Sequence, residues 1–310
     1  MINDIRAAAG RIKGRVLRTP LRHSPWLSDA AGGDVFLKLE SVQPTFSYKI
    51  RGATNAVLKL VESGDPRPIV TASAGNHGYA MAHAAAAAGR PLTVFISRNA
   101  PRTKVDAIRK AGAELRPCHD YDEAERRARE QGAGTDAIYI SPYAHPDVIA
   151  GAGTVGLEII QDDPSVELIV TSVGGGGLVS GIAFAAPGVA VVGAEIAAST
   201  PFTQSLAAGR IVQIEVGETI ADGLIGNLDP GSPTFDIVRE HVRSIVVVQE
   251  EETVAAIRQM FLEERLIVEG AAAVAIAAVQ LRRIDVRGRR TAVVVSGANI
   301  DLLTWGPIWN

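Results

Sequence analysis

The chain has 310 residues, of which 47% are hydrophobic and 21% are charged, and its formal net charge is −3. This length and composition indicate a soluble globular protein with one large or two modest domains. The slight negative charge gives no reason to expect a nucleic-acid or acidic-membrane partner. The first residues, 1–6, carry an acid and lack the apolar stretch of a secretory signal peptide.

The apolar runs and the cysteine content favour a cytoplasmic protein. The most apolar helical run, 271–281, is shorter than the ~20 residues that a bilayer requires, so we interpret it as a buried core helix. Cys118 is the only cysteine, which excludes an intrachain disulfide and favours an inert thiol over a catalytic one. We therefore expect no membrane partner.

Short apolar, β-branched runs recur along the chain and predict strands. Most of them are nearly continuous rather than alternating, which is typical of parallel strands that helices cover on both faces. The predicted strands are 35–39, 69–71, 92–96, 168–171, 189–192, 245–248 and 292–295.

Helical stretches lie between these strands, and several end at a glycine. Strands that alternate with helices favour an α/β fold with a mainly parallel sheet. The strands at 69–71 and 92–96 could form a compact smaller unit, and the early strand at 35–39 could join the later sheet. The predicted helices cover 76–88, 103–111, 121–131, 148–161 and 251–264, with Gly89, Gly112 and Gly132 after the first three.

Lys49, in the segment TFSYKIRGA of residues 45–53, is the first candidate for chemistry. A lysine can form an imine with an aldehyde if desolvation or nearby positive charge keeps its amine unprotonated. Arg51 is near in sequence, but residues two apart on a helix do not face the same way. The sequence alone leaves a solvated lysine at a helix start as the alternative.

The segment SAGNHG, residues 73–78, directly follows a predicted strand. Ser73 could cap the next helix, and Gly75 lets the backbone approach a ligand closely. The helix N-terminus offers free amide donors to an anion such as a substrate carboxylate, and Asn76 and His77 add a donor and a titratable group. An ordinary capped strand-to-helix turn is the alternative.

Four consecutive glycines separate a predicted strand from the next helix. They are Gly174, Gly175, Gly176 and Gly177. A strand, a glycine run and a helix in this order wrap backbone amides around a phosphate. The run lacks the G-x-G-x-x-G spacing of dinucleotide sites, although Glu195 after the next strand leaves a nucleotide site open. We therefore expect a phosphate site of some kind at this turn.

Ser296 closes the last predicted strand. The carboxyl end of a strand is where ligands bind in open α/β sheets, and a simple turn residue before Gly297 is the alternative. A lysine that binds an aldehyde, combined with a phosphate loop, describes a site for pyridoxal 5′-phosphate (PLP). None of these segments is decisive alone.

Together, the segments resemble the fold-type II PLP enzymes, in the group of the threonine/serine dehydratases and serine racemases. SYKIRGA is similar to that family's S-F-K-x-R-G-A, SAGNHG to its S-x-G-N-H-G, GGGGL to its phosphate loop, and SGAN to its terminal S-G-x-N. HPDVIAG at 145–151, ETIADGL at 218–224 and VEGAAA at 268–273 resemble further family segments, so the match covers nearly the whole chain.

The resemblance implies a tryptophan synthase β-like α/β fold of two domains, each a mainly parallel twisted sheet flanked by helices, with PLP in the cleft between them. The large PLP-binding domain would be discontinuous and cover 1–58 and 146–310, and the small substrate-side domain would cover 59–145. The chain after Asn299 is too short for the C-terminal regulatory domain of the biosynthetic threonine dehydratases. A homodimer is the expected assembly.

The resemblance also implies a role for each matched residue. Lys49 would hold PLP through the imine and later take a proton from the substrate Cα. Asn76 would bond the ring hydroxyl, and Ser296 would meet the pyridine nitrogen. The residues expected to contact the cofactor are Lys49, Tyr48, Asn76, Gly174, Gly175, Gly176, Gly177 and Ser296. The residues expected at the substrate carboxylate are Ser73, Ala74, Gly75 and His77.

Several positions depart from the family pattern. Ala74 stands where the racemases carry a second serine that exchanges a proton on the opposite ring face, so the resemblance favours dehydration over racemisation. Phe46 replaces a glycine and Ala152 replaces a glutamine, which leaves the substrate side chain open. Glu195 matches a cation ligand, but Pro201 stands where a second ligand would be, so a monovalent or divalent cation rests on Glu195 alone.

We therefore predict a PLP-dependent ammonia-lyase that converts a β-hydroxy-α-amino acid, such as L-threonine or L-serine, into a 2-oxo acid and ammonia. An amino-acid racemase, or another β-elimination or β-replacement enzyme on the same scaffold, is the alternative. A nucleotide-binding protein or a non-catalytic PLP carrier would belong to a different class. The expected partner is a small amino-acid substrate.

Overall fold

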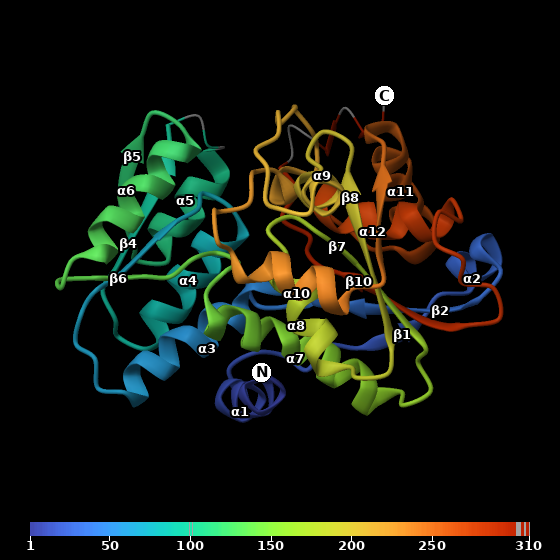
Figure 1. Cartoon of the computed structure of the whole chain (residues 1–310), viewed down its shortest axis with the longest axis horizontal. Helices are drawn as coiled ribbons and strands as arrows, with labels where there is room; N and C mark the ends of the chain where they lie inside the picture. Colours follow the sequence, from blue (N-terminus) through green and yellow to red (C-terminus); the bar gives the residue numbers. More distant parts are fainter. Residues whose placement is uncertain (99, 101, 302–304, 307, 310) are drawn as a thin grey trace.

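The computed structural model describes residues 1–98, 100, 102–301, 305, 306, 308 and 309 and contains two separate β-sheets surrounded by helices (Figure 1). Among these residues, the larger sheet has six strands in the order β1-β2-β10-β7-β8-β9. All neighbouring strands are parallel except β1, which runs antiparallel to β2. The strands are β1 (Leu21–His23), β2 (Asp34–Leu39), β7 (Leu168–Ser172), β8 (Ala190–Ile196), β9 (Ser244–Val248) and β10 (Arg290–Val295).

The smaller sheet has four parallel strands in the described residues, in the order β5-β4-β3-β6. The predicted α/β fold with mainly parallel sheets is therefore confirmed. The early strand β2 pairs in parallel with β10, so the N-terminal part of the chain joins the sheet that the C-terminal part forms. The smaller sheet consists of β3 (Ile69–Ala72), β4 (Leu92–Ser97), β5 (Glu114–Cys118) and β6 (Ile138–Tyr139).

Three strands were not predicted, and the predicted range of a fourth was too short. β1 and β6 have three and two residues, too few for a visible apolar run. β5 carries Arg116 and Pro117, which suit its place at the edge of the sheet but break the apolar pattern. The strand predicted at 189–192 is β8, which extends to Ile196 because it pairs with β9 along that stretch.

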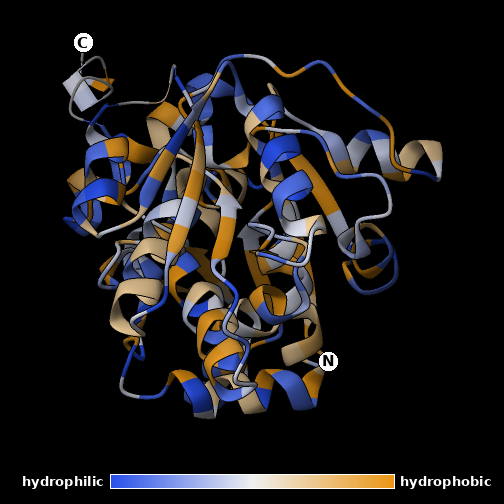
Figure 2. Ribbon diagram, turned by 90° about the vertical axis from the view of Figure 1, so that its left-hand side faces the viewer, coloured by the Kyte–Doolittle hydropathy of each residue, from blue (hydrophilic) through white to orange (hydrophobic). Residues whose placement is uncertain are grey.

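Twelve α-helices lie within the described residues, and hydrophobic residues concentrate on the inner strands while hydrophilic ones lie outside (Figure 2). The helices are α1 (Ile2–Ile12), α2 (Pro25–Ala31), α3 (Lys49–Glu62), α4 (Asn76–Ala87), α5 (Arg102–Lys110), α6 (Tyr121–Ala133), α7 (Pro146–Asp162), α8 (Gly177–Ala185), α9 (Pro201–Ala208), α10 (Pro233–His241), α11 (Glu250–Glu264) and α12 (Gly270–Gln280). Two short 3₁₀ helices are η1 (Glu40–Val42) and η2 (Asp222–Leu224).

The apolar helix predicted at 271–281 is α12, and its residues 270–279 are buried, as expected for a core helix. Among the described residues, no helix has both the length and the hydropathy needed to cross a bilayer. The role predicted for Gly132 is wrong, because α6 continues to Ala133. A Cβ at Gly132 would lie 2.3 Å from the Cβ of Tyr139, so this glycine permits close packing of α6 on β6.

A buried ion network fixes the start of α3, the helix that begins at Lys49. Arg51 is fully buried and donates to both oxygens of Glu40, at 2.7 and 2.8 Å, and to Glu158 of α7 at 2.7 and 2.9 Å. Lys38 of β2 also pairs with Glu158, at 2.8 Å. Because removing one partner would leave another charge buried and unpaired, this network holds α3 against the larger sheet and α7.

Candidate active site

The amine of Lys49 is desolvated and is linked to the glycine run through residues 142 and 143. Its Nζ donates a hydrogen bond to the carbonyl of Pro142 at 2.8 Å. The next residue, Tyr143, packs against that run, where a Cβ at Gly175 would lie 2.3 Å from the Tyr143 ring. Burial lowers the pKa of Lys49 to about 8, although the charge of Glu269 opposes this shift. At pH 7 the amine is therefore still mostly protonated, but a far larger fraction of it is unprotonated than in a solvated lysine.

Tyr48 lies next to this amine, with its ring centroid 5.3 Å from Lys49 Nζ. Burial raises the pKa of the Tyr48 phenol, and Glu269 raises it further, so the phenol stays neutral. The preceding Phe46 has a φ of +55°, a conformation that suits the glycine of the family pattern better than a bulky residue, and its side chain is exposed.

The glycine run joins β7 to α8 and leaves the start of that helix open. Gly176 has a φ of +84° and forms the N-cap, and among the described residues no side chain caps α8. A Cβ at Gly176 would lie 2.5 Å from the Phe202 ring, and a Cβ at Gly177 would lie 2.7 Å from the Tyr143 carbonyl. Glycine is thus required at these positions, and the free amides of the first turn can receive a phosphate.

The loop 73–78 ends β3 and begins α4. The expected helix cap at Ser73 is wrong: Gly75 is the N-cap, and Ser73 Oγ accepts from Gly75 N at 3.2 Å. No described side chain caps α4, so its first amides are available to an anion. Ala74 is partly buried against the core of the smaller sheet. A Cβ at Gly78 would lie 2.0 Å from the Ser73 carbonyl, which explains this glycine.

His77 lies in the core rather than at a solvated surface. Its ring is 2% exposed, and Nε2 lies 3.1 Å from Thr71 Oγ1. The Thr71 hydroxyl donates to the Ile140 carbonyl, so Nε2 is the nitrogen that donates to Thr71. Burial lowers the pKa of His77 well below its usual value, and Lys49 lowers it further. The ring is neutral, and its buried Nδ1 has no hydrogen-bond partner among the described residues.

The loops after β3 and β10 meet at a cluster of amide and carboxylate groups. Asn76 Nδ2 donates to Glu269 Oε1 at 2.7 Å, and Asn299 Nδ2 donates to Asn76 Oδ1 at 2.7 Å. The carbonyl of Ser296 accepts from Tyr48 N at 3.0 Å, which ties this loop to the lysine segment. The predicted residues Lys49, Tyr48, Asn76, Ser296 and the glycine run are therefore brought together.

Glu195, the candidate cation ligand, has another structural role. Its carboxylate accepts from Phe202 N at 2.8 Å and from Thr203 N and Oγ1 at 3.0 and 2.6 Å, at the start of α9. Burial raises the pKa of this carboxyl. Within the described residues, no group of three or more His, Cys, Asp or Glu could hold a metal ion.

Sequence reasoning did not assign a role to four residues that the structure places at the site. They are Pro142, Tyr143, Glu269 and Asn299. Glu269 and Asn299 lie inside the segments VEGAAA and SGAN, so the signal was present in the family resemblance. No pattern marked 142–143, because this pair reaches the site only through tertiary packing.

Two independent observations indicate that the residues of this site fit PLP. The open start of α8 at the glycine run can receive a phosphate, and the lysine at the same place has a partly unprotonated amine that can bind an aldehyde. Residues 142 and 143 connect these two features. The Pro142 carbonyl accepts a hydrogen bond from Lys49, and Tyr143 packs against the glycine run. A nucleotide would not explain the desolvated lysine.

Comparisons with known proteins identify the family. The family described as "Pyridoxal-phosphate dependent enzyme" matches residues 12–297. L-threonine ammonia-lyase of Thermotoga maritima is 41% identical and aligns with 97% of this chain and 76% of its own length. L-threo-3-hydroxyaspartate ammonia-lyase of Saccharomyces cerevisiae is 36% identical, with 96% and 93% covered. The structure of maize serine racemase matches with a TM-score of 0.92 at 33% identity, covering 99% of this chain and 96% of the racemase. The chain therefore belongs to the pyridoxal-phosphate dependent enzymes of fold type II.

Proposed function

We propose that this enzyme is an ammonia-lyase that converts a β-hydroxy-α-amino acid, such as L-threonine or L-serine, into a 2-oxo acid and ammonia. The observation that carries this proposal is the desolvated amine of Lys49 in a site where Ala74 offers no second proton carrier. Relatives named as ammonia-lyases, at 41% and 36% identity, support the same reaction class.

The residues of this chain would hold the cofactor at several points. Lys49 would bind its aldehyde carbon, the glycine run its phosphate, Asn76 its ring hydroxyl and Ser296 its ring nitrogen, with Tyr48 beside the ring. Bound PLP draws electrons from the substrate α-carbon and makes the proton there acidic. The neutral Ser296 hydroxyl stabilises a positive ring nitrogen less than a carboxylate would, which suits prompt loss of the β-substituent.

The substrate would lie between the start of α4 and Lys49. The free amides of the first turn of α4, which begins at Asn76, would receive its carboxylate, together with the Ser73 hydroxyl. The substrate amine would replace Lys49 on the aldehyde carbon and so free its amine. Burial lowers the pKa of this amine to about 8, and its unprotonated form would take the proton from Cα. The β-hydroxyl then leaves with a proton as water, and hydrolysis of the remaining unsaturated amine gives the 2-oxo acid and ammonia.

The domain division implied by the family is part of the proposal: 1–58 with 146–310, and 59–145. The two sheets support it, because β3 to β6 all lie between residues 69 and 139. The boundary at 58 falls inside α3, whose Ile50, Ala53, Ala56 and Val57 pack in the core of the smaller sheet, so α3 serves both units. We also propose a cytoplasmic homodimer. A cation at Glu195 would compete with the start of α9 for this carboxylate.

A screen of 2-oxo acid release tests the function. Purified protein with PLP is given serine, threonine, 3-hydroxyaspartate and phenylserine, in both enantiomers where available. We expect turnover of at least one L-β-hydroxy amino acid. A visible absorbance band that borohydride removes, leaving a label on Lys49, tests the cofactor assignment separately. A labelled protein that turns over none of these compounds would support the PLP carrier instead.

Replacing Ala74 with serine should raise racemisation. Lys49 can reach Cα from one face, and inversion needs a second proton carrier on the other face, within hydrogen-bond reach. Ala74 presents only a methyl group, so we expect the native enzyme to prefer one enantiomer strongly. In Ala74→Ser, racemisation of serine should rise by at least ~10-fold, since general acid–base catalysis contributes ~10²–10⁴-fold. The measurement is chiral analysis of the unreacted substrate.

Ala87→Ser is the matched control, because Ala87 is exposed at the end of α4, the helix that follows the loop of Ala74. It should leave both racemisation and elimination at native rates. A native enzyme that already racemises as fast as it eliminates would contradict the role given to Ala74 and favour the racemase.

A further inference from the structure

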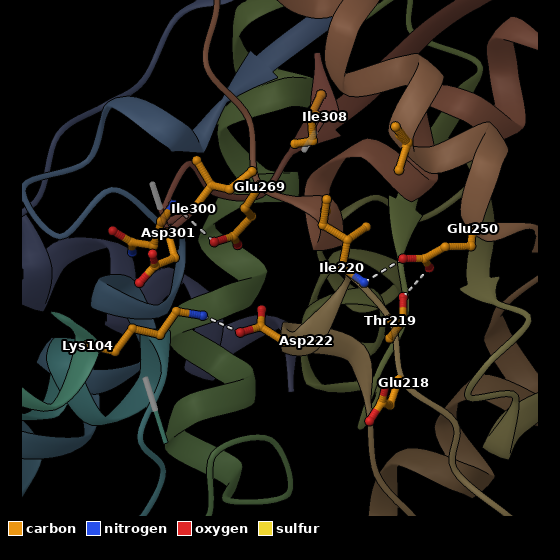
Figure 3. A pocket seen from close by; sticks show the side chains of 13 residues that line it. Lys104, Glu218, Thr219, Ile220, Asp222, Glu250, Glu269, Ile300, Asp301 and Ile308 are labelled. Atoms are coloured by element: carbon orange, nitrogen blue, oxygen red, sulfur yellow. Dashed lines mark hydrogen bonds and ion pairs between the residues drawn. The ribbon is translucent and has the colours of Figure 1, made fainter. Parts of the chain in front are cut away.

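Glu269 is a buried carboxylate that takes no part in the proposed reaction steps. It is the N-cap of α12, is 5% exposed, and lines a cavity of about 470 Å³ (Figure 3). The cavity also borders Asn299, so it adjoins the amide cluster next to Lys49. A carboxylate is rarely buried without partners, because desolvating its charge is costly.

Glu269 closes a ring of hydrogen bonds that joins three distant segments. Its Oε1 accepts from Asn76 Nδ2 at 2.7 Å, and its Oε2 accepts from Asn299 N at 3.0 Å. Asn299 Nδ2 completes the ring by donating to Asn76 Oδ1 at 2.7 Å. The loop after β3, the loop after β10 and the start of α12 are thereby held in one arrangement.

The ring determines which way the Asn76 amide points. An ionised carboxylate only accepts, so it requires the Nδ2 of Asn76 on its side. If the amide turned over, its oxygen would face the carboxylate and its nitrogen would face the Asn299 amide nitrogen, and two bonds would be lost. Asn76 is therefore fixed as a donor while Glu269 is ionised, which it mostly is above pH 7, because its pKa is raised to about 7. One hydrogen of Nδ2 is left for another acceptor, which is the role proposed for this residue toward the ring hydroxyl of PLP.

Glu269 also acts on Lys49 through its charge. Its charge raises the pKa of Lys49, against the lowering by burial. The pKa of Glu269 itself is raised to about 7, chiefly by burial and also by the charge of Asp222 of η2, against the lowering by the Asn76 hydrogen bond and by Lys104 of α5. Lys104 and Asp222 form an ion pair across the cavity, so they partly cancel each other (Figure 3).

We propose that Glu269 is a positioning residue of this active site, which fixes the Asn76 amide as a hydrogen-bond donor and supplies the negative charge that the Lys49 amine faces. The proposal rests on the function proposed above for Lys49 and Asn76. It concerns properties of the protein that can be measured without any turnover, so it fails or holds independently of the substrate.

The first test measures Lys49 alone. Full-length protein is freed of cofactor, shown to rebind PLP, and labelled with an amine reagent between pH 6 and 10, and the Lys49 peptide is quantified by mass spectrometry. We expect a labelling midpoint near pH 8 in the native chain. In Glu269→Gln the midpoint should fall by about one unit, because loss of a nearby negative charge destabilises the ammonium form. Glu269→Asp keeps the charge and should keep the native midpoint.

Glu250→Gln is the matched control, because Glu250 lines the same cavity but bonds to Thr219 and Ile220 instead of Asn76. It should leave the Lys49 midpoint unchanged. An unchanged midpoint in Glu269→Gln, an equal fall in Glu250→Gln, or a fall in Glu269→Asp as large as that in Glu269→Gln would each overturn the electrostatic role.

The second test measures the amide ring through cofactor binding. Glu269→Gln and Glu269→Asp both break at least one bond of the ring, so PLP affinity in absorbance titrations should fall by ~10-fold or more, as for the loss of one hydrogen bond to a charged group. Circular dichroism establishes that each variant is folded, and the Asp variant stands in if the Gln variant does not fold. Native PLP affinity in a folded variant would overturn the positioning role.

Discussion

Replacing Lys49 with alanine should abolish 2-oxo acid formation and the covalent retention of PLP. The alanine side chain can neither bind the aldehyde nor take the Cα proton, and a positioned base alone contributes ~10²–10⁴-fold. We therefore expect turnover to fall by at least ~10⁴-fold. The measurements are the initial rate with the best substrate of the screen and the PLP absorbance that remains after dialysis.

The fold should survive this change. Burial lowers the pKa of Lys49 from 10.5 to about 8, so the charged amine is less stable in the folded state than in the unfolded chain. This penalty is fully present below pH 8 and fades as the pH rises toward 10.5. Cofactor-free Lys49→Ala should therefore melt no lower than the native cofactor-free chain at pH 7.

Lys59→Ala is the control lysine on the same helix. Lys59 is half exposed and pairs with Asp147 at the surface. Its loss should leave turnover and PLP retention at native levels. If Lys49→Ala kept native turnover, the assignment of the cofactor lysine would be wrong, and if Lys59→Ala abolished turnover, the loss could not be assigned to the chemistry of position 49.

The strands that carry the site could be predicted from the sequence, because burial on both faces leaves continuous apolar runs. β3, β7 and β10 all have this pattern, and each delivers a site segment at its carboxyl end. The short strand β1 and the edge strand β5 could not be predicted in this way. Each of these edge strands pairs with only one other strand and is partly open to solvent, so its residues do not form a continuous apolar run.

The site itself was only partly visible in the sequence. Lys49 and the glycine run are recognisable because their chemistry depends on residue type. Lys49 gains its low pKa from burial that no local pattern encodes. Glu269 stands in a segment that resembles the family, but its bond to Asn76 could not be predicted, because Asn76 is 193 residues away. The pairing of Tyr143 with Gly175 likewise depends on how the two sheets are placed together.

Replacing Gly175 with aspartate should strongly weaken PLP binding. A Cβ at this position would lie 2.3 Å from the Tyr143 ring, so either the ring or the glycine run must move. Tyr143 is held by the bond from Asp229 N to its hydroxyl at 3.0 Å, and the Gly175 carbonyl accepts from Thr234 Oγ1 at 2.9 Å. Neither side can shift without losing a bond.

The added carboxylate also repels a phosphate that the amides of this turn would receive. Losing one hydrogen bond to a charged group costs ~1.5–3 kcal/mol of binding free energy. Loss of two such bonds predicts a fall in PLP affinity of at least ~10²-fold, measured by absorbance titration of cofactor-free protein. Gly10→Ala is the control, since Gly10 lies in α1 with nothing within 4 Å of its added Cβ, and it should retain native affinity.

Because the amine of Lys49 is tied to Pro142, next to Tyr143, a shift of the Tyr143 ring should also change the labelling of Lys49. Native PLP affinity in folded Gly175→Asp would move the phosphate site away from the glycine run and separate it from the lysine.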